Sequence, residues 1–177
     1  MQTLTNPSLS EPLAISQSLA RMPVFEGLKP EWIDILAQAA MRIRFNPGQL
    51  IFRQGEQANC FYLIEEGKVS LLFEENREPC RLTVLGKSEI LGWSWLFPPH
   101  LWQFTARAVS PSQVLFFCGT RLREICEKNY EFGYELMKRF SAVMVQRLQC
   151  SRLELIRSRR EVYRLSTNAS KDDYKEF

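Results

Sequence analysis

The sequence has little histidine, no closely spaced cysteines and no long apolar run. Its 177 residues include one histidine, His100, and five cysteines, none of which belongs to a Cys-x-x-Cys pair. Because metal sites are normally built from short-spaced histidines and cysteines, we expect neither a metal nor a cofactor. An odd number of scattered cysteines also argues against a disulfide framework, so we expect free thiols that are mostly buried.

Two further absences narrow the class of protein. No apolar run approaches the roughly 20 residues of a membrane-spanning helix, and the first 18 residues lack the basic and apolar stretches of a signal peptide. We therefore predict a cytoplasmic protein without a membrane span. No nucleophile–base pair is visible, and one histidine cannot supply the ligands of a metal-dependent cupin, whose barrel a β-roll resembles. We therefore expect no enzyme.

Short alternating segments separated by glycine- and proline-containing turns fill the middle of the chain. Met41–Phe45 alternates apolar and basic residues, and the turn Asn46-Pro47-Gly48 follows it. Similar segments recur about every ten residues as far as Cys118, a spacing typical of a β-sandwich or roll. The pattern predicts a flexible arm (1–18), N-terminal helices and a β-roll (19–119), C-terminal helices (120–165) and a disordered tail (166–177).

The C-terminal segment carries two patterns. Its seven-residue spacings form a thin, partly polar heptad seam that predicts a dimer helix, the alternative being a helix packed on its own domain. Residues 138–164 also contain eight basic side chains against Glu154 and Glu161. Such a helix can contact phosphates or an acidic protein, but no aromatic or amide residues that read bases accompany it. The candidate dimer residues are Met137, Met144, Leu148, Leu155 and Val162.

The densest feature is an aromatic stretch around residues 92–107, which holds three of the four tryptophans. A glycine before a short helical segment lets backbone N–H groups converge on an anion. The rings predict either an aromatic plug of the core, because aromatics dominate cores by buried area, or a ligand pocket with a few polar groups. The candidate pocket residues are Gly92, Trp93, Ser94, Trp95, Trp102, Gln103, Thr105 and Arg107.

Residues 46–75, NPGQLIFRQGEQANCFYLIEEGKVSLLFEE, closely resemble the opening of the cyclic-nucleotide-binding domain family. This family includes catabolite-activator and Fnr-type regulators, kinase regulatory subunits and channels. Turn glycines Gly48, Gly55 and Gly67 carry the match, which extends from about Phe25 to Leu155. The resemblance implies a mainly β fold: an eight-stranded β-roll or jelly roll with short N-terminal helices and a long C-terminal helix, the dimer interface of the bacterial regulators.

The resemblance weakens at the family's phosphate-binding cassette. In nucleotide-binding members it reads Gly-Glu-apolar-Ala and then Arg-Ser/Thr-Ala; the glutamate holds the ribose and the arginine holds the phosphate. Here Gly92 matches the glycine, Trp93 stands in the place of the glutamate, and Trp102 or Gln103 stands in the place of the arginine, with Arg107 several residues too late. A buried phosphate without its partner costs about 3–5 kcal/mol, so we predict no binding of cyclic AMP or cyclic GMP.

The expected output also differs from that of the bacterial regulators, which carry a helix-turn-helix after the long helix. Here about a dozen polar residues follow Leu165, so we expect no recognition helix and no sequence-specific DNA binding. The sequence predicts a stand-alone regulatory module with a degenerate cassette that acts through protein partners, or as a homodimer through its C-terminal helix. The alternative is a genuine cyclic-nucleotide receptor of Crp/Fnr type with a variant pocket. Neither the ligand nor the partner can be named from the sequence.

Overall fold

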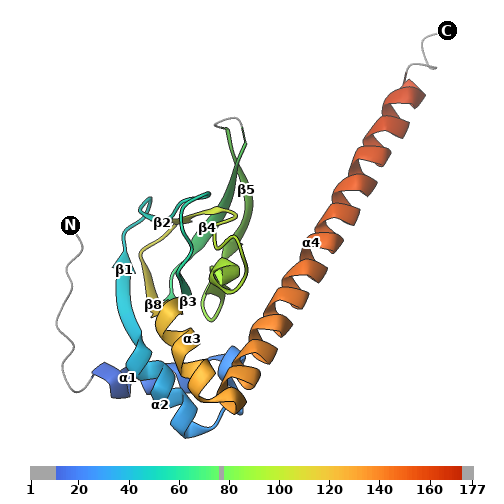
Figure 1. Cartoon of the computed structure of the whole chain (residues 1–177). Coiled ribbons are helices and arrows are strands. Elements are labelled where there is room, and N and C mark those ends of the chain that lie inside the picture. The colour runs from blue at the N-terminus through green and yellow to red at the C-terminus, as the bar shows by residue number, and fades with distance from the viewer. Residues whose placement is uncertain (1–10, 76–77, 173–177) are drawn as a thin grey trace. The chain divides into compact units, whose positions relative to one another are not determined.

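Eight antiparallel strands arranged in two four-stranded sheets form a β-roll (Figure 1). The structure is a computed structural model that describes residues 11–75 and 78–172. The first sheet has the order β1-β8-β3-β6 and the second has the order β2-β7-β4-β5. The strands are β1 (Ala40–Phe45), β2 (Leu50–Phe52), β3 (Cys60–Glu66), β4 (Val69–Glu75), β5 (Glu78–Leu85), β6 (Ile90–Leu91), β7 (Thr105–Ala108) and β8 (Ser112–Cys118). The predicted fold class is confirmed.

Strand β3 lies inside the first sheet, hydrogen-bonded to β8 on one side and to β6 on the other. Its residues from Cys60 to Glu65 are all buried. A strand covered on both faces reads as a continuous apolar run, which is why this segment does not alternate as Met41–Phe45 does. Strand β6 has two residues and is too short to give a periodic signal.

The turn glycines predicted from the sequence adopt the backbone that they were expected to provide. Gly48, Gly55 and Gly67 have φ angles of 82°, 83° and 91°. At Gly67 a Cβ atom would also collide with the carbonyl oxygen of Pro111 and the side chain of Ser112. The β3–β4 hairpin therefore requires glycine here for space as well as for backbone conformation.

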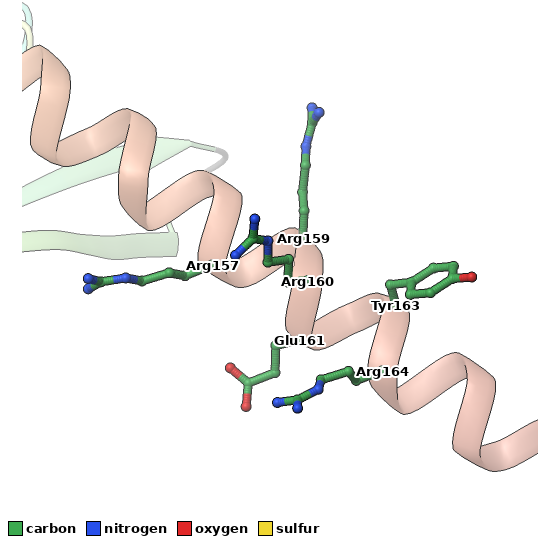
Figure 2. Close-up of a pocket in the computed structure, with 6 residues that line it drawn as sticks. All are labelled: Arg157, Arg159, Arg160, Glu161, Tyr163 and Arg164. Carbon is green, nitrogen blue, oxygen red and sulfur yellow. The ribbon is translucent and has the colours of Figure 1, made fainter.

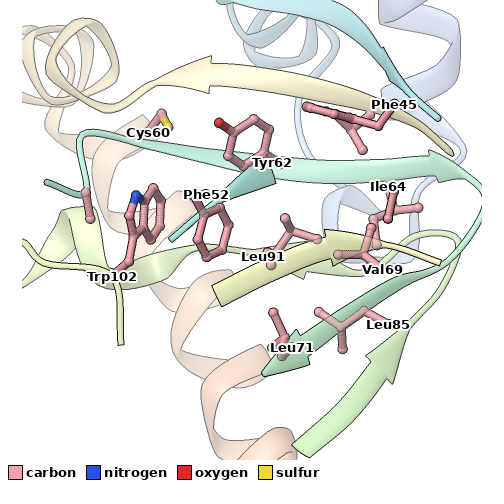
Figure 3. Close-up of a cluster of buried hydrophobic side chains, with 14 residues drawn as sticks. Phe45, Phe52, Cys60, Tyr62, Ile64, Val69, Leu71, Leu85, Leu91 and Trp102 are labelled. Atoms are coloured by element: carbon pink, nitrogen blue, oxygen red, sulfur yellow. The ribbon is translucent and has the colours of Figure 1, made fainter. Parts of the chain in front are cut away.

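The core lies between the two sheets and is built from inward-facing side chains of both (Figure 3). Trp102 closes one end of it. Its buried members are Phe45, Phe52, Ala58, Cys60, Tyr62, Ile64, Val69, Leu71, Leu85, Leu91, Trp102, Ala106, Ala108 and Val114.

Helices precede and follow the strands of the roll in the sequence. They are α1 (Glu11–Ala20), the 3-10 helix η1 (Pro23–Phe25), α2 (Pro30–Ala39), α3 (Gly119–Lys128) and α4 (Tyr130–Asp172), with a further 3-10 helix, η2 (Trp93–Leu96), between β6 and β7. The expected flexible arm is wrong for residues 11–18, because α1 packs against α2 and buries Ile15 and Leu19. Pro12 falls in the first turn, where a helix tolerates proline. The first ten residues lie outside the described part.

The C-terminal boundary also needs correction. Helix α4 continues to Asp172, so the predicted disordered tail is wrong for residues 166–172; residues 173–177 lie outside the described part. After Gly133 the chain contains neither glycine nor proline, and without such residues nothing in the local sequence stops a helix. The chain divides into two compact units, residues 1–139 and 140–177, and the described part of the second unit is the remainder of α4.

Candidate functional site

The centre of the candidate site is Gly92, which lies between β6 and η2. Its φ of 86° is left-handed, and it caps the N-terminus of η2. A Cβ atom at this position would lie 2.5 Å from Cζ3 of Trp102. Glycine is therefore needed here for its backbone conformation and for the close approach of the Trp102 ring.

Trp102 fills the space beside Gly92. Its ring is 4% exposed and stacks on Phe52, with a centroid distance of 4.0 Å and an interplanar angle of 15°. Phe52 in turn stacks on Tyr62 at 6.0 Å, and Figure 3 shows Trp102 and Phe52 side by side beneath β3. Stacked rings at these distances attract one another in addition to burying apolar area. The end of the core beside Gly92 is thus occupied by the protein's own side chains.

Trp95 lies in a different cluster. It is fully buried and stacks on Phe61 at 5.8 Å, while Phe61 stacks on Phe117 at 4.4 Å. Phe61 and Tyr62 are neighbours on β3, and successive residues of a strand face opposite sides of the sheet. The structure therefore brings Gly92 and Trp102 together and places Trp95 on the other face of the first sheet. Trp93 and Ser94 are partly buried in η2.

Two of the polar candidates are used within the protein. Thr105 is fully buried, and its Oγ1 accepts a hydrogen bond of 3.0 Å from the backbone N–H of Gln54. Gln103 is exposed, and its Nε2 donates to the carbonyl oxygen of Leu101. Neither side chain belongs to the core cluster around Trp102.

Arg107 lies on β7 and is exposed. Its neighbours Ala106 and Ala108 belong to the core cluster, so the alternation of the strand directs Arg107 to the opposite face. There its Nη1 donates a 2.6 Å hydrogen bond to the carbonyl oxygen of Gly48. The guanidinium thus holds the β1–β2 turn.

The interior beside Trp102 is uncharged. Among the described residues, Glu65 is the only buried side chain that carries a charge. It faces away from this interior, because its neighbour Ile64 belongs to the core cluster and successive residues of a strand face opposite sides. Burial raises the pKa of the Tyr62 hydroxyl, and the neighbouring Cys60 raises it further. Burial likewise raises the pKa of the Cys60 thiol. Both groups are therefore neutral at physiological pH.

Sequence reasoning missed a buried ion pair on the outer face of the first sheet. Glu65 is 5% exposed; its Oε2 accepts from Nε of Arg42 at 2.6 Å and its Oε1 accepts from Nη2 of Arg42 at 2.9 Å. Ser18 Oγ and Gln113 Nε2 also donate to the carboxylate, at 2.6 and 3.1 Å. Burial alone raises the pKa of Glu65, but these hydrogen bonds and the charge of Arg42 outweigh burial and lower it. The four side chains lie far apart in the sequence, so no local pattern could have revealed them.

The cysteines differ in part from expectation. All five cysteines are free, but the expectation that most are buried is wrong: Cys80 and Cys150 are exposed, Cys118 and Cys126 are intermediate, and Cys60 alone is buried. Cys80 lies on β5, at the edge of the second sheet, and Cys150 lies on α4. Nδ1 of His100 lies 3.1 Å from the carbonyl oxygen of Trp95. Within the described residues, no group of three or more metal-binding side chains comes together.

The candidate dimer residues lie along α4. Met137 and Met144 are partly buried, whereas Leu148 and Leu155 are 52% and 54% exposed. Val162 belongs to α4, but its side chain is not among those described. Further along, the arginines of α4 border an open hollow on the helix surface, and Figure 2 shows that they point in several directions. None of the described helices has both the length and the apolar content to span a membrane.

The comparison with protein families concerns the roll. Residues 42–129 match the family model described as the cyclic nucleotide-binding domain. These residues form a cyclic nucleotide-binding domain. The match extends from within β1 through α3, and therefore includes Gly92 and Trp102.

Relatives of the domain include bacterial regulators. Over 137 residues the chain is 26% identical to the CRP-like cAMP-activated global transcriptional regulator of Mycobacterium tuberculosis, a match that covers 76% of this chain and 59% of that protein. The chain thus spans less than two thirds of this relative's length. The catabolite activator protein of Thermus thermophilus has a TM-score of 0.63 and 26% identity, covering 75% of this chain and 61% of that one.

A more distant structure supports the fold alone. A cyclic nucleotide-binding domain from Methylobacillus flagellatus has a TM-score of 0.73 at 13% identity, and the match covers 84% of both chains. The sequence-based family assignment is therefore confirmed by the family model, the relatives and the fold.

Proposed function

We propose that this chain is a regulatory module in which Trp102 occupies the phosphate site of a cyclic nucleotide-binding domain, so that it works without cyclic AMP or cyclic GMP. The observation that carries the proposal is the contact of the Trp102 ring with Gly92, at the position where the glycine of the family's cassette stands. No catalytic role is proposed, and the module acts through protein partners.

The free-energy cost of displacing Trp102 supports the proposal that its ring occupies the phosphate site. A nucleotide can enter beside Gly92 only if Trp102 leaves its stack on Phe52. Removing a buried tryptophan from a core costs about 3–5 kcal/mol, which corresponds to roughly two to four decades of affinity. The entering phosphate would meet no counter-charge, because Arg107 is on the other face and is bonded to Gly48.

The alternative is a cyclic-nucleotide receptor with a variant pocket. The cAMP-activated regulator of M. tuberculosis, which shares 26% identity with the chain, favours this alternative. It requires Trp102 to move and another group to neutralise the phosphate. The two functions therefore differ in one measurable quantity, the affinity for cyclic AMP and cyclic GMP.

Calorimetric titration of the full chain with each nucleotide tests the proposal. We expect no saturable heat at micromolar nucleotide. Micromolar affinity would overturn the proposal and establish the alternative. The double variant Trp93→Glu/Trp102→Arg supplies the two side chains that the cassette of the family contains, and serves as the comparison: if the roll is otherwise competent, this variant binds more tightly than the natural chain.

We also propose that a second copy of this chain covers the seam on α4. Leu148 and Leu155 are about half exposed, and Glu154 and Arg159 flank the seam on opposite sides. In a parallel, in-register pair, residues in these positions form salt bridges between helices, so that Glu154 of one copy faces Arg159 of the second copy. This pair of opposite charges favours a parallel homodimer, and it opposes the repulsion between Arg147 and Arg152, which occupy the same positions one heptad earlier.

The mass measured by light scattering tests this pairing with a matched pair of variants. Leu155→Glu places a charge in the seam, whereas Leu153→Glu places one at a leucine with the same exposure, 54%, on another side of α4. We expect a dimer for the natural chain and for Leu153→Glu, and a monomer for Leu155→Glu. A monomeric natural chain, or equal masses for the two variants, would contradict the proposal.

A further inference from the structure

Two cysteines that are 58 residues apart in the sequence lie directly opposite each other in the first sheet. Cys60 begins β3 and Cys118 ends β8, and the antiparallel register pairs them. The next hydrogen bond runs from the N–H of Gly119 to the carbonyl oxygen of Asn59, at 2.8 Å. Cys60 and Cys118 therefore occupy a non-hydrogen-bonded pair of the ladder, the closer of the two kinds, with Cα atoms about 4.5 Å apart.

This position satisfies the geometry of a disulfide. Opposite residues of an antiparallel pair project from the same face of the sheet, and disulfides join Cα atoms about 4.4–6.8 Å apart. Cys60 belongs to the core cluster between the sheets, so Cys118 faces the same interior. The two thiols are close enough that Cys118 adds to the effect of burial in raising the pKa of Cys60.

The two thiols differ in access to solvent. Cys60 is 5% exposed, whereas Cys118 is only partly buried. A small oxidant therefore reaches Cys118 first, and Cys60 is the neighbouring thiol that can react with the product. This arrangement of an accessible cysteine beside a buried partner is what an intramolecular thiol oxidation requires.

We propose that Cys60 and Cys118 are an oxidisable dithiol that closes to a disulfide between β3 and β8 when the protein meets a peroxide. In the first step the Cys118 thiolate attacks one oxygen of hydrogen peroxide, the O–O bond breaks, and Cys118 becomes a sulfenic acid while hydroxide leaves and takes up a proton. In the second step the Cys60 sulfur attacks the Cys118 sulfur and expels water, with the Cys60 proton going to the departing oxygen. In total the two thiols lose two electrons, and the peroxide becomes two water molecules.

The environment sets the rates and the reversibility of this reaction. Because burial raises the pKa of the Cys60 thiol, less thiolate is present at that sulfur, which slows its attack on the Cys118 sulfenic acid. Because Cys118 is only partly buried, a thiol reductant can reach its sulfur in the disulfide, and exposed disulfides are reduced more readily than buried structural ones. The bond is therefore a reversible modification.

The test uses the full chain with its other cysteines removed, as Cys80→Ser, Cys126→Ala and Cys150→Ser. The protein is treated with hydrogen peroxide, the remaining thiols are alkylated with iodoacetamide, and the intact mass is measured. We expect the loss of two hydrogen atoms, no alkylation, and recovery of both thiols after dithiothreitol. Digestion is expected to give one linked pair of peptides, containing residues 60 and 118.

Two outcomes would overturn the proposal. One is full alkylation of both cysteines after peroxide treatment, and the other is a Cys118 that stops at the sulfenic acid or links to a second chain. A further Cys118→Ser change in the same background serves as the control, and its intact mass is expected to be that of a single chain without a disulfide link. If the background variant does not fold, peptide mapping of the natural chain after the same treatment gives the decision, because the linked peptides identify the pair.

Discussion

Strand β3 buries a charged side chain, Glu65, on one face, whereas the side chains that it buries on the other face are uncharged. On the outer face, Glu65 receives two hydrogen bonds from Arg42, one from Ser18 and one from Gln113. On the inner face, the core beside Gly92 contains stacked rings, and none of its described side chains is charged. The two faces of the same strand therefore differ in whether they bury a charged side chain.

The difference shows what a phosphate site would require. A buried anion is tolerated where charged and polar donors surround it, as they do at Glu65, and it is expensive where they do not. Among the described residues, no buried basic side chain is available to a cyclic phosphate on the inner face, and Arg107 lies on the outside of the second sheet. The contrast within one strand favours a module whose interior is closed by Trp102.

The largest effect is expected from removing the ring that closes the interior. Trp102→Ala deletes a side chain that is 4% exposed and stacked on Phe52, and should lower the free energy of unfolding by about 3–5 kcal/mol. Urea unfolding measures this difference. Trp93→Ala is the control, because Trp93 is only partly buried and its removal should cost less. Equal losses for the two variants would mean that Trp102 does not close the core.

A smaller effect is expected on the outer face. Arg42→Ala leaves Glu65 buried without its counter-charge, and at neutral pH should cost about 2–3 kcal/mol, less than a fully buried pair because Arg42 is 22% exposed. Since the pKa of Glu65 is lowered in the folded state, the pair stabilises the protein above the ordinary carboxyl pKa. That stabilisation is lost as the pH falls through the lowered value. The deficit of the variant should therefore shrink on acidification.

Urea unfolding at several pH values between neutral and acidic checks this prediction. The matched control is Arg44→Ala on the same strand, because Arg44 is exposed and its Nε donates to Gln113; we expect a change below about 1 kcal/mol. A deficit of Arg42→Ala that does not depend on pH would show that the ion pair is not its cause.

The roll could be predicted from the sequence because its signals are local. Turn glycines such as Gly67 mark the hairpins, and the residues between them alternate or form apolar runs of strand length. Helix α1 is hard to predict because its apolar residues form no clear helical stripe, and the burial of Ile15 and Leu19 depends on contact with α2. The end of α4 is hard to predict because a polar composition is typical of disorder as well as of an exposed helix.

The site could be predicted only in part, because its decisive contacts join distant segments. Gly92 and Trp102 are near neighbours in the sequence and were both named, but nothing local shows that Trp95 faces the other side of the sheet. The partners of Glu65 come from α1, β1 and β8. Cys60 and Cys118 meet through strand register. Such pairings depend on topology, which a single sequence does not state.

The junction between β8 and α3 has a mechanical consequence. The strand ends at Cys118 and the helix begins at Gly119, so no connecting residue is available to absorb movement. A movement of β8 is therefore transmitted directly to the first turn of α3. The contacts that hold the end of β8 in the sheet therefore also set the orientation of α3.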